Sequence, residues 1–337
     1  MTLYGFRLYQ VHVTSGRTRP RLTFGTAPLD TPARQFAERL TELQGRVFVR
    51  EAAYQPRDGA PDEGRAIPAR TPVMRIDQVR LVGNSVEVGV TYGRKGEYDI
   101  AVSVDGGADI RLDQAAASRP YRAFVHFPAA GDTAVMVSEV VGRTHVGETL
   151  LKRLSVENFQ DSEAAGTAPS GPVDGTWLRW LPRGMFDENR IREVLTDGTI
   201  AGVRLHRAAM SSGGRRTSRD LTLHQNGLPA TKFRDAQAMV ERWLKRHLGI
   251  KVEENGSPAV GALVELIEAD VAGVGFTDGV LEFTESGRVH SLGPSNLERI
   301  MVYPIGDQAP TTDALRAAAA GRLRPLVQQF SIPIDVT

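Results

Sequence analysis

The sequence predicts an α+β protein of two domains, in which mostly antiparallel sheets pack with helices. Three observations support this class. Turn signals such as Gly83-Asn84 separate segments in which apolar residues alternate, a pattern typical of antiparallel hairpins. Other segments repeat apolar residues at helical spacing, so helices are interspersed with the strands. The chain has 337 residues, enough for two domains at ~100–200 residues per domain.

The first domain is expected to span residues 1–160. A helix is predicted at residues 31–43, because Phe36, Leu40 and Leu43 fall on one helical face. Apolar alternation and apolar runs predict strands at residues 4–13, 46–53, 75–82, 85–92, 99–104, 121–128 and 133–141, followed by a second helix at residues 148–154.

The domain boundary is predicted at residues 161–175, DSEAAGTAPSGPVDG. This segment is small, polar and proline-bearing and has no apolar periodicity, which is typical of a flexible linker. The second domain then covers residues 176–337 and ends in a helix that Pro325 is expected to bend or end. Its strands are expected at residues 177–181, 200–207, 218–225, 262–276, 280–284 and 299–305, and its helices at residues 189–195, 232–248 and 312–329.

The composition excludes several classes of protein. Hydrophobic residues make up 41% of the chain and charged residues 24%, as in ordinary globular proteins. The absence of cysteine excludes a disulfide framework, a thiolate nucleophile and cysteine-ligated metal sites. The opening residues MTLYGFRLYQVHV lack the features of a secretory signal, and no apolar run is long enough to span a membrane. We therefore expect a cytoplasmic protein without a membrane partner.

The charges are unevenly distributed along the chain. Residues 1–176 carry 21 basic and 21 acidic groups, residues 177–250 carry 14 and 7, and residues 251–337 carry 6 and 12. Such a basic block suits the phosphate backbone of a nucleic acid, which arginine and lysine bind without reading bases. The predicted phosphate contacts are Arg215, Arg216 and Arg219 on a glycine-containing loop, Arg204 and Arg207 on the strand that leads into it, and Lys245 and Arg246 on the following helix.

Known catalytic motifs are not found. The chain has no GxxxxGK[ST] phosphate loop, no GxSxG nucleophile motif and no HExxH zinc motif. We therefore assign no catalytic residue, no metal ligand and no cofactor. One histidine pair stays open: alternation along the hairpin of residues 200–207 and 218–225 places His206 and His224 on the face opposite Val203 and Leu205. These histidines either bind a metal ion or act as acid and base, or they are solvated residues on the surface of a strand.

Residues 123–154, AFVHFPAAGDTAVMVSEVVGRTHVGETLLKRL, read as a strand, a Gly-Asp turn, a strand and a helix. With its Gly131-Asp132-Thr133 turn, this stretch resembles the RexA-type phage-exclusion proteins of lambdoid prophages, and KwaB-type phage-defence proteins are similar in size and arrangement. The resemblance implies a two-domain, non-enzymatic intracellular protein that binds DNA, dimerises and takes part in sensing phage infection. It transfers no functional residue to this chain.

The leading hypothesis is a cytoplasmic bacterial protein of phage defence or exclusion that binds double-stranded DNA without being an enzyme. Its other expected partners are a second defence-system protein and a second copy of the chain. Two alternatives stay open. The chain is either an assembly module whose basic and acidic blocks pair between subunits, or a nuclease or hydrolase of unrecognised type.

Overall fold

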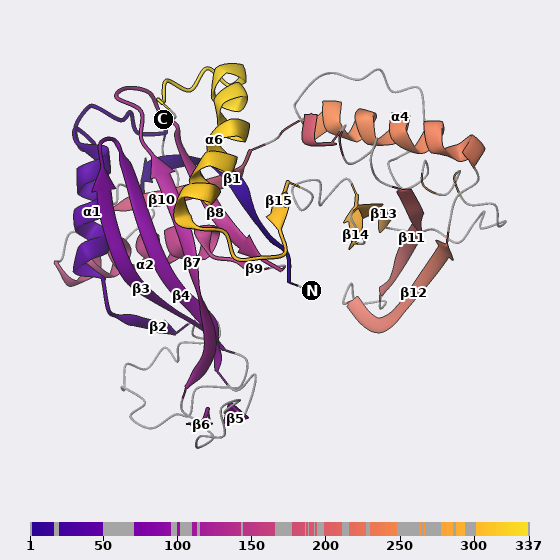
Figure 1. Cartoon of the computed structure of the whole chain (residues 1–337), viewed down its shortest axis with the longest axis horizontal. Helices are drawn as coiled ribbons and strands as arrows, with labels where there is room; N and C mark the ends of the chain where they lie inside the picture. The colour runs from indigo at the N-terminus through magenta and orange to yellow at the C-terminus, as the bar shows by residue number, and fades with distance from the viewer. Residues whose placement is uncertain are drawn as a thin grey trace. The chain divides into compact units, whose positions relative to one another are not determined.

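The structure is a computed structural model, in which the chain divides into two compact units (Figure 1). Unit 1 comprises Met1–Gly184 and Tyr303–Thr337, and unit 2 comprises Met185–Val302. The residues that the structure describes are 2–16, 20–49, 71–95, 100–101, 110–112, 115–142, 144–165, 177–185, 187, 189–191, 193, 199–210, 216–226, 230–247, 263, 266, 278–285, 288–293 and 301–335.

Unit 1 is built on an antiparallel sheet in the order β10-β1-β8-β7-β4-β3-β2, with β15 paired to β1 and β9 paired to β8. The predicted hairpin at Gly83-Asn84 is confirmed, because β3 and β4 pair on either side of it. The strands are β1 (Tyr4–Ser15), β2 (Val47–Val49), β3 (Pro72–Val82), β4 (Ser85–Lys95), β7 (Ala116–His126), β8 (Ala134–Val141), β9 (Thr144–His145), β10 (Leu178–Gly184) and β15 (Tyr303–Gly306), and a separate pair is formed by β5 (Ile100–Ala101) and β6 (Ile110–Arg111).

Helices lie on both faces of this sheet. On one face, α1 (Pro32–Glu42) and α2 (Gly147–Ala164) bury Phe36 and Leu150 in one core with alternate strand residues such as Val88. On the other face, α6 (Thr312–Gln329) contacts β1 and places Arg316 over the ring of Phe124. Pro325 does not end α6, which continues to Gln329. Among the described residues, no helix is long and apolar enough to cross a membrane.

The observed units differ from the predicted domains of residues 1–160 and 176–337. The strand β10 pairs with Tyr9–Ser15 of β1, and β15 pairs with Tyr4–Phe6 of the same strand. At this second pairing, a Cβ on Gly5 would lie 2.4 Å from the carbonyl oxygen of Tyr303, so glycine permits the close approach. Because both strands belong to the first sheet, unit 2 is an insertion within unit 1.

The predicted linker at residues 161–175 is wrong at its first residues. Its first residues continue α2, which ends at Ala164, while residues 166–176 lie outside the described residues. The small and polar composition of this segment carries no information about which sheet the following strand joins. That pairing depends on β1, which lies more than 150 residues earlier in the chain.

Unit 2 contains a second antiparallel sheet, in the order β12-β11-β13-β14, which packs against α4. Val203, Leu205 and Phe283 of the sheet are buried with Val240 and Trp243 of the helix. The strand predicted at residues 262–276 is wrong at its described positions, where residue 263 is helical and residue 266 lies in a turn. The elements are β11 (Thr199–Met210), β12 (Arg216–Asn226), α4 (Ala230–His247), β13 (Asp278–Glu285) and β14 (Arg288–Leu292).

Candidate nucleic-acid interface

The paired strands β11 and β12 are longer than β13 and β14, the other two strands of their sheet (Figure 1). The pairing of β11 with β13 extends from Thr199 to His206. Its pairing with β12 continues to Met210, which lies opposite Arg216. Among the described residues, β11 and β12 therefore continue past the end of the β11–β13 ladder as a two-stranded antiparallel ribbon.

Three of the predicted phosphate contacts lie on this extension. Arg207 is paired in register with Leu221, Arg216 is paired with Met210, and Arg219 lies between these two rungs on β12. The side chains of these three arginines, and those of Lys245 and Arg246 near the end of α4, lie outside the described part of the structure, as does the whole of Arg215. The structure thus brings Arg207, Arg216 and Arg219 onto one ribbon by backbone register.

Arg204 differs from the other predicted contacts because its charge is already compensated within unit 2. One of its terminal nitrogens lies 2.5 Å from a carboxylate oxygen of Glu282, which is almost completely buried. The other oxygen of Glu282 lies 2.8 Å from Nε2 of His224. The pair contributes little net charge toward a nucleic acid, although the guanidinium of Arg204 has further N–H donors.

The predicted two-faced hairpin is confirmed. Val203 and Leu205 are buried in the core, while Arg204 and His206 alternate with them toward the other face. On that face, His206 forms a 3.1 Å hydrogen bond through Nδ1 with the hydroxyl of Thr222. The helix α4 packs on the face that carries Val203 and Leu205, because Val240 and Trp243 share their core.

Sequence reasoning missed Glu282 as the partner of this polar face. The residue belongs to the acidic third of the chain, and its pairing with Arg204 spans 78 positions. A signal was nevertheless present, because Glu282 alternates with Leu281 and Phe283 in a predicted strand. Alternation places such a carboxylate on the polar face, but it does not identify the neighbouring strand.

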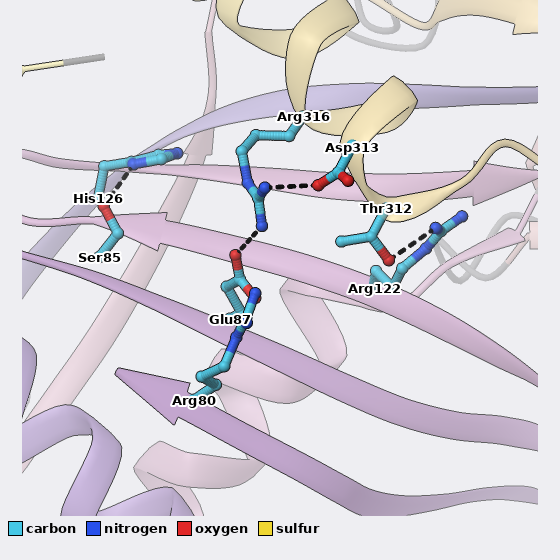
Figure 2. A network of polar contacts seen from close by, with 8 residues as sticks. All are labelled: Arg80, Ser85, Glu87, Arg122, His126, Thr312, Asp313 and Arg316. Atoms are coloured by element: carbon cyan, nitrogen blue, oxygen red, sulfur yellow. Dashed lines mark hydrogen bonds and ion pairs between the residues drawn. The ribbon is translucent and has the colours of Figure 1, made fainter. Parts of the chain in front are cut away.

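Unit 1 carries a second group of polar residues that the sequence did not reveal (Figure 2). Glu87 of β4 binds two arginines, Arg80 of β3 and Arg316 of α6. The guanidinium of Arg122 on β7 forms two contacts with Glu139, of 2.6 and 3.0 Å, and a third with the carbonyl oxygen of Pro310 at 2.9 Å.

These contacts border a cavity of about 400 Å³ between the sheet and the start of α6. The hydroxyl of Thr312 accepts a 3.3 Å hydrogen bond from Arg122, and Asp313 is bonded to Arg316 at 2.8 Å. Each arginine around the cavity is paired with a carboxylate of the same network. The network therefore fastens the first turn of α6 to the sheet, and we do not assign a ligand to the cavity.

A half-buried histidine lies at the edge of this network. His126 of β7 forms a 2.8 Å hydrogen bond with the hydroxyl of Ser85, its cross-strand neighbour (Figure 2). Burial lowers the pKa of His126 to about 4, and the positive charge of Arg316 acts in the same direction. The imidazole is therefore neutral near pH 7, which suits a structural group between two strands.

No protein-family model matches the chain, and no curated protein matches it significantly. The segment that resembles RexA-type proteins folds as β7, a connection in which Gly131 has a positive φ, β8, the short strand β9 and α2, so two strands and a helix follow one another as expected. This order is common to many antiparallel sheets, so the relationship itself stays a prediction.

Proposed function

We propose that this chain is a bacterial protein of phage defence or exclusion that binds double-stranded DNA through the β11–β12 ribbon. The observation that carries the proposal is the extension of this ribbon past β13, with Arg207, Arg216 and Arg219 along it. A two-stranded ribbon has the dimensions to enter the major groove of B-DNA. Arginines on such a ribbon neutralise phosphates on the groove walls and fix the position of the protein on the duplex.

The distribution of charge supports the same surface. Residues 177–250 carry 14 basic and 7 acidic groups in a chain whose total charge is only +1. A local excess of this kind attracts the nucleic-acid backbone even when the whole protein is nearly neutral. The ion pair between Arg204 and Glu282 lies on the part of β11 that is paired with β13. The proposed contacts are therefore Arg207, Arg216 and Arg219 of the extension, together with Arg215, which precedes β12 in the sequence. Lys245 and Arg246 are proposed to support them.

The proposal is tested by measuring the affinity for a fluorescent DNA duplex at salt concentrations between about 50 and 200 mM. The logarithm of the binding constant should fall linearly with the logarithm of salt concentration, with a slope near −0.9 for each phosphate contact. Replacing Arg207, Arg216 and Arg219 together by glutamine should flatten this slope by about 2–3 units, because up to three contacts are lost.

A matched control removes three positive charges from unit 1 instead. Arg34, Arg94 and Arg119 are exposed there, and their replacement by glutamine should leave the slope within error of the unchanged chain. Equal losses in the two triple variants would show that only net charge matters and would refute the ribbon as the interface. A chain that binds no duplex even at the lowest salt would instead favour the assembly-module alternative.

A further inference from the structure

The polar face of the unit 2 sheet is the face of the β11–β12 ribbon that can meet the bases of a duplex. On the other face, Val203 and Leu205 are buried in a core with α4. The polar face carries Arg204 and, opposite it in the register, His224, whose side chains retain exposures of 40% and 36%. A ribbon in the major groove presents one face to the base edges, and α4 covers the other face next to the sheet.

A buried carboxylate holds the guanidinium of Arg204 in place. Oε1 of Glu282 lies 2.5 Å from Nη2 of Arg204, and the side chain of Glu282 is only 5% exposed. Oε2 lies 2.8 Å from Nε2 of His224, whose ring lies over Gly202, because a Cβ on that glycine would be 3.4 Å from the same nitrogen. Both oxygens of Glu282 therefore have partners, so the carboxylate is fixed in position and fixes the guanidinium in turn.

The guanidinium of Arg204 keeps hydrogen-bond donors that Glu282 does not use. A guanidinium carries several N–H donors in one plane, and Glu282 contacts a single nitrogen of this one. Among the described residues, no other acceptor is bonded to Nε or Nη1 of Arg204. Because the side chain is 40% exposed, these donors can bind an acceptor that comes from outside the protein.

We propose that Arg204 recognises a guanine base in the major groove, with Glu282 as its positioning residue. This inference rests on the proposed DNA binding and names the base that the ribbon recognises. Guanine presents two acceptors side by side in that groove, O6 and N7, which match two N–H groups of one guanidinium. Adenine and cytosine each present an amino donor there, which opposes the donors of arginine, and thymine presents a single acceptor beside a methyl group.

The ion pair with Glu282 gives Arg204 a different role from that of the arginines on the ribbon extension. Arg207, Arg216 and Arg219 are proposed to neutralise phosphates, so they release counterions and make binding depend on salt. The charge of Arg204 is already balanced by a carboxylate, so its contact with a base releases few counterions but discriminates between bases. A guanidinium that is held in place before binding also loses less conformational freedom when it binds.

The first test uses the full chain and a pool of fluorescent DNA duplexes randomised over one helical turn, ~10 base pairs. We expect the bound duplexes to be enriched in guanine at a fixed position. Replacing this G·C pair by A·T should weaken binding about 5- to 100-fold, the range of one bidentate contact. Replacing the guanine by 7-deazaguanine removes the N7 acceptor and should also weaken binding. Hypoxanthine keeps O6 and N7 and lacks only the amino group of the minor groove, so it should preserve the affinity.

Variants of the ribbon separate base recognition from phosphate binding. Arg204→Ala should abolish the preference for guanine and change the salt slope by much less than the ~0.9 of one phosphate contact. The triple glutamine variant of Arg207, Arg216 and Arg219 should flatten the slope and keep the preference. Because Arg204→Ala leaves Glu282 without its arginine, the double variant Arg204→Ala/Glu282→Gln removes both charges and should show the same loss of preference.

The single variant Glu282→Gln tests the positioning role. Without the carboxylate, the guanidinium of Arg204 is held less firmly and its charge is uncompensated. The preference for guanine should therefore fall, and the salt slope should become steeper by up to about 0.9. Misfolding removes contacts and does not steepen the slope, and the double variant should lose the steeper slope again. Arg234 is exposed on α4, which packs on the other face of the sheet, so Arg234→Ala should keep the preference.

The outcomes distinguish the failure of this inference from the failure of the proposed function. Duplex binding by the unchanged chain without a preference for guanine would overturn guanine recognition and leave DNA binding in place. A preference that survives in both Arg204→Ala and the double variant would do the same, as would equal affinity for the guanine and 7-deazaguanine duplexes. No binding of any duplex at about 50 mM salt would overturn both proposals.

Discussion

Replacing Arg122 by alanine is expected to lower the free energy of unfolding of unit 1 by about 3–5 kcal/mol. Glu139 on the neighbouring strand has an exposure of 3% and receives both side-chain contacts of its ion pair from Arg122. Without the guanidinium, the carboxylate keeps the backbone N–H of residue 122 but loses the only opposite charge that contacts it among the described residues. An uncompensated buried charge is among the costliest defects that one substitution can introduce.

The measurement is urea denaturation followed by tryptophan fluorescence in a Trp243→Phe background. This change removes the tryptophan of unit 2, so that Trp177 and Trp180 report on unit 1 alone. Adding Glu139→Gln to Arg122→Ala removes the unpaired charge and should restore a large part of the stability. A loss below about 1 kcal/mol in the single variant, the size expected for an exposed ion pair, would contradict the structural role assigned to this pair.

Acidification from pH 7 to pH 5 is expected to destabilise unit 1 by several kcal/mol. Burial lowers the pKa of His126 and of His145 to about 4, and the positive charges of Arg316 and Arg7, respectively, act in the same direction. In the unfolded chain the same groups have a pKa near 6.5. Between pH 6.5 and pH 4, the unfolded state therefore binds more protons than the folded state, and the free energy of unfolding decreases as the pH is lowered through this window. Each histidine contributes up to about 3 kcal/mol over the whole window.

The pH dependence is measured as the free energy of unfolding at several pH values, again in the Trp243→Phe background. His126→Gln and His145→Gln should each reduce the slope between pH 7 and pH 5, whatever their effect on stability at pH 7. The pKa of Asp132 is lowered by a hydrogen bond from Thr133 and by Arg21, so stability from that carboxylate is lost only at more acidic pH. An unchanged slope in the double histidine variant would refute the assignment.

Local signals predicted much of the fold. The α1 helix follows from three apolar residues on one face, and the β3–β4 hairpin follows from Gly83-Asn84 between alternating strands. The pairings of β10 and β15 with β1 could not be obtained in this way. Each is a short strand whose partner lies far away in the chain, and alternation specifies the face of a strand but not its neighbour.

In the candidate sites, too, only the contacts that are local in sequence could be predicted. Alternation alone placed Arg204, His206 and His224 on one face of a hairpin, because the hairpin is local in sequence. It did not provide Glu282, which reaches these residues from β13. The contact of Arg316 with Glu87 spans 229 positions, and a pair of opposite charges at such a separation has no recognisable pattern in a single sequence.

The edge of β1 has a consequence for how this chain tolerates change. Gly184, the last residue of β10, is aligned with Tyr9, and Tyr303, the first of β15, is aligned with Phe6. These positions are three residues apart on one strand, a span of about 10 Å that a loop of ordinary length covers. Residues 185–302 thus leave the sheet of unit 1 and return to it at neighbouring positions along one strand. Exchanging, shortening or deleting them therefore leaves the strand order of that sheet unchanged.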